Sequence, residues 1–342
     1  MIWLTWRQFR AQALAVLIIV VAAAVYFLIT GLHMRHTYTA DLASCDSQND
    51  CGLVLNQLQG TYNAAFQLAE LLMISVPALI GIFWGAPLIG RELETGSYQL
   101  AWNQSVTRTR WLAVKLAGIA LASMATAGLL SYLLTWWAGP LDQIAGNRFA
   151  ALSFSTRDIV PLGYAAFAFA LGATAGLMLR RTIPAMAVTL AVFIGIQILV
   201  PNVIRPNLLP STTVTVPVNQ TTTIQADGIM TRINSGDTWI DGLVNVPDGA
   251  WVLSTTPVEY SSGRLASRSL IQACLPGPDR EPGKNAFIAF GACLAGDNLH
   301  EAVSYQPASH YWPLQWYETG MFLALAGLLS GSCFWWIRRR QI

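Results

Sequence analysis

Six separate apolar runs, each about as long as a bilayer is thick, constrain this chain more than any other feature. A helix needs about 20 apolar residues to cross the hydrocarbon core of a membrane. The runs contain few or no charged residues and cover residues 11–32, 71–89, 111–138, 159–179, 183–203 and 319–337. The sequence therefore predicts an all-α polytopic membrane bundle of six transmembrane helices.

Composition supports a membrane protein. Only 11% of the 342 residues are charged, against roughly 25% in an ordinary soluble domain, so much of the surface must face something other than water. A net charge of +2 does not indicate a nucleic-acid partner. The first run is longer than the apolar core of a signal peptide, usually about 7–15 residues, so we expect it to be a retained helix.

Basic residues mark one side of the predicted bundle. Loops on the cytoplasmic side of a membrane carry an excess of Lys and Arg. One set of run ends is strongly basic, with Arg7, Arg10, Arg91, Arg108, Arg110, Lys115, Arg180, Arg181, Arg338, Arg339 and Arg340. The other set has only the scattered Arg35, Arg148, Arg157 and Arg205. We expect a multi-pass protein of the cell membrane with both termini in the cytoplasm.

These positions define three parts of the chain. Residues 1–203 form a membrane domain with spans one to five, an amphipathic N-terminal helix and a cytoplasmic loop at 90–110. Residues 204–317 lie outside, and 318–342 hold the sixth span and a basic tail. Thr, Val and aromatic residues alternate within 211–225, 239–246 and 251–256, which favours strands. We therefore predict a small β-rich extracytoplasmic domain between spans five and six.

Four of the five cysteines fall in the predicted external segments. Cys45 and Cys51 share the first segment, Cys274 and Cys293 share the second, and Cys333 is alone in the last span. Disulfides persist outside the cytoplasm, so we predict the pairs Cys45–Cys51 and Cys274–Cys293. Four cysteines allow three pairings, and free thiols remain an alternative.

No catalytic or metal-binding pattern stands out in the sequence. The four histidines, His33, His36, His300 and His310, form no HExxH motif, so we expect no metal. The closest approach to a phosphate-binding loop, residues 277–284, has one residue too many and lacks the Ser or Thr that should follow its lysine. No cofactor is expected in this chain.

The spans themselves are almost free of charge. Ion-coupled carriers place ionisable residues near the middle of the membrane, whereas Glu70 and Glu318 stand at the outer ends of their runs and Lys115 near the inner end of its run. Any coupling energy should therefore come from elsewhere, and the pathway suits an apolar or amphipathic cargo.

Three runs contain two glycines four residues apart, a spacing that lets helices approach closely. The pairs are Gly81/Gly85, Gly172/Gly176 and Gly327/Gly331. Packing within the bundle is the simpler interpretation, and a homodimer contact along one of these faces is the alternative.

The segment between the second and third runs is polar and too long for a simple turn. Two acids, Glu92 and Glu94, follow the second run directly, Gly96 allows the chain to bend, and Ser105 and Thr107 are good N-caps for the third span. A short helix along the membrane face would present Glu92, Glu94, Gln104 and Arg108 to a cytosolic partner. A solvated loop whose arginines only fix the topology is the alternative.

The same segment carries a resemblance. Residues 85–116, GAPLIGRELETGSYQLAWNQSVTRTRWLAVKL, resemble the signature of ABC-2-type transporter permeases found in actinobacteria. Residues 3–12 and 306–320 are similar to the first helix of that family and to its approach to the last span. Residues 207–300 show little similarity.

This resemblance implies the membrane subunit of an ATP-driven exporter for a hydrophobic or amphipathic substrate. Two permease copies would form a dimer within the lipid, and each would rest on a separate ATPase subunit that binds ATP and Mg. The chain itself would not be an enzyme. The residues implied in ATPase coupling are Arg91, Glu92, Glu94, Gly96, Trp102, Gln104, Ser105, Thr107 and Arg108.

Two other classes of function are the alternatives. A receptor-like or scaffold membrane protein would act through its external domain and leave the loop passive. An intramembrane enzyme would need positioned acid–base partners, and the sequence offers no convincing Ser/His/Asp set.

Overall fold

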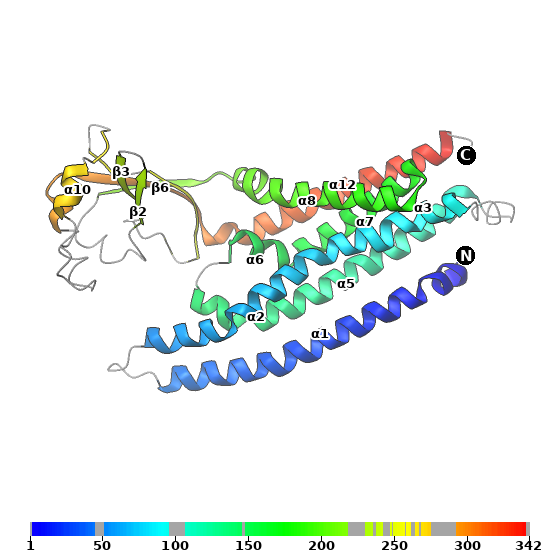
Figure 1. Ribbon diagram of the computed structural model, residues 1–342, viewed down its shortest axis with the longest axis horizontal. Coiled ribbons are helices and arrows are strands. Elements are labelled where there is room, and N and C mark those ends of the chain that lie inside the picture. Colours follow the sequence, from blue (N-terminus) through cyan, green and yellow to red (C-terminus); the bar gives the residue numbers. More distant parts are fainter. Residues whose placement is uncertain are drawn as a thin grey trace. The chain divides into compact units, whose positions relative to one another are not determined.

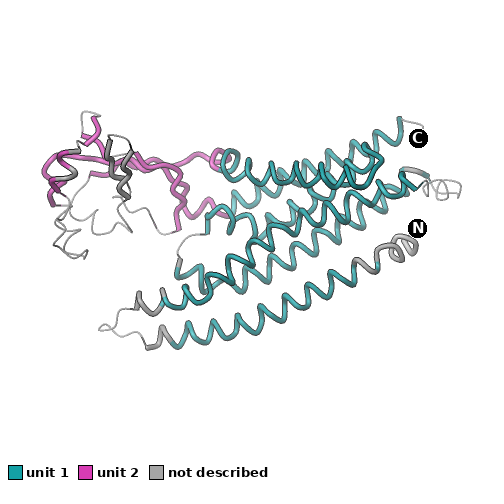
Figure 2. The backbone as a smooth tube through the Cα atoms, viewed as in Figure 1, with its two compact units in different colours: residues 1–205, 312–342 teal, residues 206–311 magenta. Residues whose placement is uncertain are grey.

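The computed structural model describes residues 2–44, 51–95, 107–145, 148–217, 230–234, 237–241, 247, 249–256, 258–260, 264–266, 268–274 and 292–339. The chain divides into two compact units (Figure 2). The first is a helical unit made of residues 1–205 and 312–342, and the second is a smaller unit made of residues 206–311.

Long apolar helices build the helical unit (Figure 1). They are α1 (Ile2–Ser44), α2 (Cys51–Ile80), α5 (Arg108–Ala145), α7 (Val160–Leu179), α8 (Thr182–Leu199) and α12 (Tyr311–Arg339). Among the described residues, six helices are long and apolar enough to cross a membrane, so the predicted six-span bundle is confirmed. The predicted N-terminal amphipathic stretch is the beginning of α1, with no break in the backbone before the first span.

The second span does not end where α2 ends. It continues through the π-helical turn η1 (Gly81–Gly85) into the short helix α3 (Ala86–Thr95). The end of α3 lies at the same end of the bundle as Arg338 and Arg339 of α12 (Figure 1). We call this the α3 end of the helical unit, and the other the opposite end.

Shorter elements lie between the long helices. The helix α6 (Ala151–Thr156) precedes α7, and α8 continues through the π-helical turn η2 (Val200–Ile204) and the 3₁₀ turn η3 (Arg205–Asn207). The described core near the α3 end contains Trp84, Trp111 and Leu112, packed with Leu177 of α7 and Ile337 of α12.

The closest helix contact joins η1 to α7. A Cβ atom added at Gly81 would lie 2.7 Å from the carbonyl oxygen of Ala168, and one added at Gly85 would lie 2.6 Å from that of Phe169. A Cβ atom at Gly172 would in turn run into the carbonyl oxygen of Gly81. These three glycines therefore meet the facing helix backbone to backbone, where no side chain would fit.

The fourth glycine of the first two predicted pairs is Gly176, which packs further along α3 than Gly172 does. A Cβ atom added at Gly176 would lie 2.5 Å from the carbonyl oxygen of Ala86 and 3.1 Å from the backbone nitrogen of Gly90. Both of these atoms belong to α3, so the close contact continues from η1 along the first turn of α3. Gly176 is buried inside the bundle and thus takes no part in an exposed helix face.

The third glycine pair has different surroundings. Gly327 and Gly331 lie on α12, and a Cβ atom at either position would have no described atom outside its own helix within 4 Å.

The smaller unit is built on an antiparallel sheet. Its strands are β1 (Thr212–Pro217), β4 (Trp251–Thr255), β5 (Glu259–Tyr260) and β6 (Leu299–Gln306), with β6 between β1 and β4 and also paired to β5. Val214 of β1 faces Val303 of β6 in the register. A separate hairpin joins β2 (Met230–Asn234) to β3 (Asp237–Asp241).

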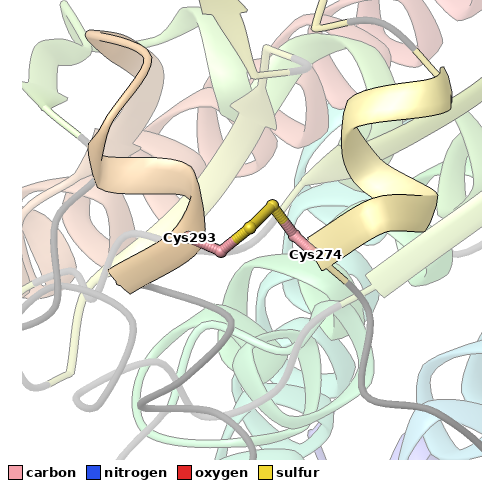
Figure 3. Close-up of a disulfide and its surroundings, with 2 residues drawn as sticks. All are labelled: Cys274 and Cys293. Atoms are coloured by element: carbon pink, nitrogen blue, oxygen red, sulfur yellow. A yellow bond between two sulfur atoms is a disulfide. The ribbon is translucent and has the colours of Figure 1, made fainter.

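The predicted pair Cys274–Cys293 is a disulfide in the smaller unit (Figure 3). It connects α10 (Arg268–Cys274) to a helical turn that begins at residue 292. Cys274 is buried among Val258, Leu294 and Leu299, so the bridge belongs to the core of this unit. Cys45 and the Cys51 side chain lie outside the described part of the chain, and their pairing stays a prediction.

The glycine contact predicts a clear stability difference. Gly172→Ala forces a methyl group against the backbone of η1, and overpacking of this kind costs about 1–3 kcal/mol. Gly118→Ala is the matched control, because a Cβ atom at Gly118 meets nothing within 4 Å.

Denaturant titration of the purified protein in mixed micelles measures both variants. We expect a lower free energy of unfolding for Gly172→Ala and no loss for Gly118→Ala. Equal stability of the two variants would contradict the close contact.

Candidate functional site

The helix α3 is held to its neighbours along one face. Ala86, Ile89 and Gly90 are buried, while Arg91, Glu94 and Thr95 near its end are exposed. This change from buried to exposed follows from the sequence, since α3 begins with small and apolar residues and ends with charged ones. The helix thus has its base in the bundle and its end at the surface.

Glu92 connects α3 to α5. Its carboxylate forms an ion pair with Lys115, whose side chain is only 5% exposed, against 16% for Glu92. The Lys115 ammonium also lies 4.8 Å from the centre of the Trp111 ring. A charge in such a place is tolerated when it is paired, so the pair fixes where α3 lies against α5.

Glu94 connects α3 to α8. One carboxylate oxygen accepts hydrogen bonds from the Thr182 backbone N–H at 3.2 Å and from the Thr182 hydroxyl at 2.8 Å. Thr182 is the first residue of α8, where N–H groups lack partners within the helix and a negative charge is favourable. The Glu94 carboxylate is therefore a helix cap supplied by another span.

The other residues implied in coupling are placed in part. Arg91 is exposed, and Thr107 precedes α5 with its hydroxyl 3.4 Å from the backbone nitrogen of Arg110. Arg108 begins α5, but its side chain is not described. The remaining residues of this set lie outside the described residues: Gly96, Trp102, Gln104 and Ser105.

At the opposite end, Arg205 forms a fully buried ion pair with Glu318. Two nitrogens of its guanidinium group donate to the two carboxylate oxygens at 2.8 and 3.0 Å, and both side chains are 0% exposed. The guanidinium group also donates to the Ser155 hydroxyl at 2.6 Å and lies 4.2 Å from the centre of the Phe154 ring. Tyr164 donates its hydroxyl hydrogen to Glu318. The pair thus joins the ends of spans five and six to α6 and α7.

A second charged cluster lies around Arg157, between α6 and α7. Arg157 forms an ion pair with Asp142 and another with Glu70 at 3.5 Å, and all three side chains are buried or nearly so. Arg148, at 48% exposed, reaches the other oxygen of Asp142 at 3.3 Å. Arg157 also lies 4.7 Å from the centre of the Phe66 ring.

Sequence reasoning missed both clusters, because it treated these arginines as scattered external charges. One signal was available. Arg205 ends one apolar run and Glu318 begins the next, and charges beside membrane spans usually pair with one another.

Two apolar hollows flank α1. A cavity of about 590 Å³ lies between α1 and α2 over α5, with Ala23, Phe27, Leu72 and Leu134 in its lining. A smaller one of about 220 Å³ lies between α1 and α5 beside Trp84. The first span is therefore loosely packed along part of its length. Within the described residues, no three or more His, Cys, Asp or Glu side chains are grouped to hold a metal ion.

Six apolar helices and paired charges at the span ends define a polytopic α-helical membrane protein. Residues 17–205 match a family model described as ABC-2 membrane transporter related, which covers more than half of the chain. The chain belongs to this family, so it is an ABC-2-type permease and a membrane transport component. The resemblance to ABC-2-type transporter permeases is thereby confirmed. Comparisons with curated proteins and with solved structures gave no match.

The buried ion pair Arg205–Glu318 leads to a second prediction about stability. Removing one partner of a buried pair leaves an uncompensated charge and costs about 3–5 kcal/mol. We expect this loss in the free energy of unfolding for Arg205→Met, and a partial recovery when Glu318→Leu is added. Arg148→Gln is the control, since a half-exposed pair contributes at most about 1 kcal/mol.

Denaturant titration in mixed micelles compares the three variants. If Arg205→Met were as mild as Arg148→Gln, the buried pair would not hold the opposite end together.

Proposed function

We propose that this permease is the membrane-spanning subunit of an ATP-driven exporter. A separate ATPase subunit, which binds ATP and Mg, docks at the α3 end and drives it. The observation that carries this proposal is the attachment of α3, an exposed helix end tied to other spans through both of its carboxylates.

The attachments give a force applied at α3 a route into the bundle. Glu92 connects the helix to α5, Glu94 connects it to α8, and the glycine contact connects it to α7. Because α3 continues α2 through η1, motion of its end is passed to four spans together. Packed elements of this kind move as units rather than bend gradually.

The cargo we propose is hydrophobic or amphipathic. Both hollows beside α1 are lined almost wholly by apolar side chains. The buried charges Arg157 and Arg205 of the opposite end are neutralised by acids, so neither is free to attract an ion.

We further propose a homodimer with both termini in the cytoplasm. Two of the three glycine pairs are used inside the bundle, and Gly327 and Gly331 on α12 remain open, so α12 is the candidate contact between copies. The basic residues at the α3 end support a cytoplasmic location for that end.

The alternative is a receptor-like or scaffold protein that acts through residues 206–311. The folded sheet and disulfide of that unit are compatible with such a role. This alternative predicts that no ATPase subunit binds at α3.

Affinity purification in mild detergent from native membranes tests the proposal. We expect a soluble subunit with a Walker A loop to co-purify at one copy per permease, in a complex whose native mass contains two of each. If no ATPase appears under conditions that preserve other membrane complexes, the receptor-like alternative takes its place.

A charge swap tests the route through Glu92. Glu92→Lys places a second ammonium group beside Lys115, and Lys115→Glu places a second carboxylate beside Glu92. Each single variant should therefore lower the apparent melting temperature of the purified complex and its rate of ATP hydrolysis. The double variant restores opposite charges and should recover both quantities. A double variant as impaired as the single ones would remove this ion pair from the route.

A further inference from the structure

Exposed charge at the α3 end is almost entirely positive. Besides Arg338 and Arg339 of α12, four arginines at this end have exposed side chains: Arg91, Arg110, Arg180 and Arg181. The sequence has only two acidic residues between Glu70 and Asp142, which are Glu92 and Glu94, and none between Asp158 and Asp227. The α3 end therefore has very few carboxylates of its own.

Both of those carboxylates are already used within the chain. Glu92 is paired with Lys115, and Glu94 caps α8 through Thr182 while lying close enough to Arg181 to interact with its charge. Arg91, Arg110 and Arg180 form no ion pair with any described side chain. The segment from 96 to 106 contains no acidic residue, so it brings no carboxylate to them.

Three of these arginines lie beside the end of α3, and Arg110 lies at the start of α5. Arg91 is on α3 itself, and Arg180 and Arg181 directly precede Thr182, which Glu94 holds. Arg110 lies in the first turn of α5, about 8 Å along the helix from Lys115 and about 140° around it, so it lies beside the face that Glu92 contacts. We name these four residues the basic collar.

We propose that the basic collar is a docking surface for an acidic patch on the ATPase subunit. This inference rests on the proposed function and states the chemistry of the partner's surface. Guanidinium groups bind carboxylates through paired hydrogen bonds in a fixed plane. A collar with its own acids engaged elsewhere presents that geometry to a partner.

Membrane anchoring accounts less well for the collar than for the arginines of α12. The Arg339 guanidinium lies 4.9 Å from the centre of the Trp335 ring, an arrangement suited to the lipid interface. In the described part of the chain, none of the collar arginines is stacked on an aromatic ring. The collar also surrounds the one helix end that connects to several spans, where a protein partner could transmit motion.

The test compares two sets of substitutions in the full-length tagged protein, purified from native membranes. The first replaces all four collar arginines with Gln, which keeps most of the side-chain length and removes the charge. The second replaces Arg338 and Arg339 with Gln as the control. The readout is the amount of ATPase retained per permease as the salt concentration rises.

We expect the collar variant to retain at least tenfold less ATPase than wild type at physiological salt, and the control to retain the wild-type amount. Wild-type retention should fall as salt rises, because screening weakens exposed charge pairs. Separately, Arg91→Lys and Arg180→Lys each introduce an amine. A carbodiimide should couple this amine to Asp or Glu side chains of the ATPase.

Other outcomes separate the two proposals. If wild type and the collar variant retain equal ATPase, or if the added amines link only to lipid carboxylates, the collar is not the docking surface, although the exporter proposal stands. If wild type retains no ATPase at all, the exporter proposal fails and this inference fails with it.

Discussion

The arrangement of the helical unit depends on the backbone contact of η1 and α3 with α7. Gly81, Gly85, Gly172 and Gly176 bring these helices together at a separation that no side chain would permit. Lipid offers no hydrophobic drive for helices to associate, so close packing must supply much of the attraction. This contact fixes where the second span meets α7, and from there α3 is directed toward α5 and α8.

The two ends of the helical unit use charge in opposite ways. At the opposite end, Arg157 and Arg205 are buried and neutralised by acids from other elements of the bundle. At the α3 end, the acids are engaged by Lys115 and Thr182, and the arginines remain exposed. The first arrangement holds spans together, and the second leaves positive charge available to a partner.

The six spans could be predicted because apolar length is a local property of the sequence. The disulfide Cys274–Cys293 could be predicted because both cysteines fall in one segment that the sequence predicts to be external. The ion pair Arg205–Glu318 was missed, since its partners are 113 residues apart and only their positions beside neighbouring spans indicate that they pair.

Packing also decided what the glycines and the acids of α3 contact. Spacing alone could not tell which glycine pairs face each other, nor that Gly172 meets η1 and the start of α3 while Gly176 meets α3 alone. Presentation of Glu92 and Glu94 to a partner was one of two interpretations, and neither indicated the contacts of these acids with Lys115 and Thr182. In each case the partner comes from another span, and no local pattern identifies it.

The π-helical turn η1 has a consequence for the length of the chain. Each residue of a helix advances the direction of its side chain by about 100°, given 3.6 residues per turn. Loss or gain of one residue between Gly81 and Gly85 would therefore rotate all of α3 by more than a quarter turn relative to α2. Both carboxylates would then point away from Lys115 and Thr182 although no residue of α3 had changed. Across this short stretch, the number of residues matters as much as their identity.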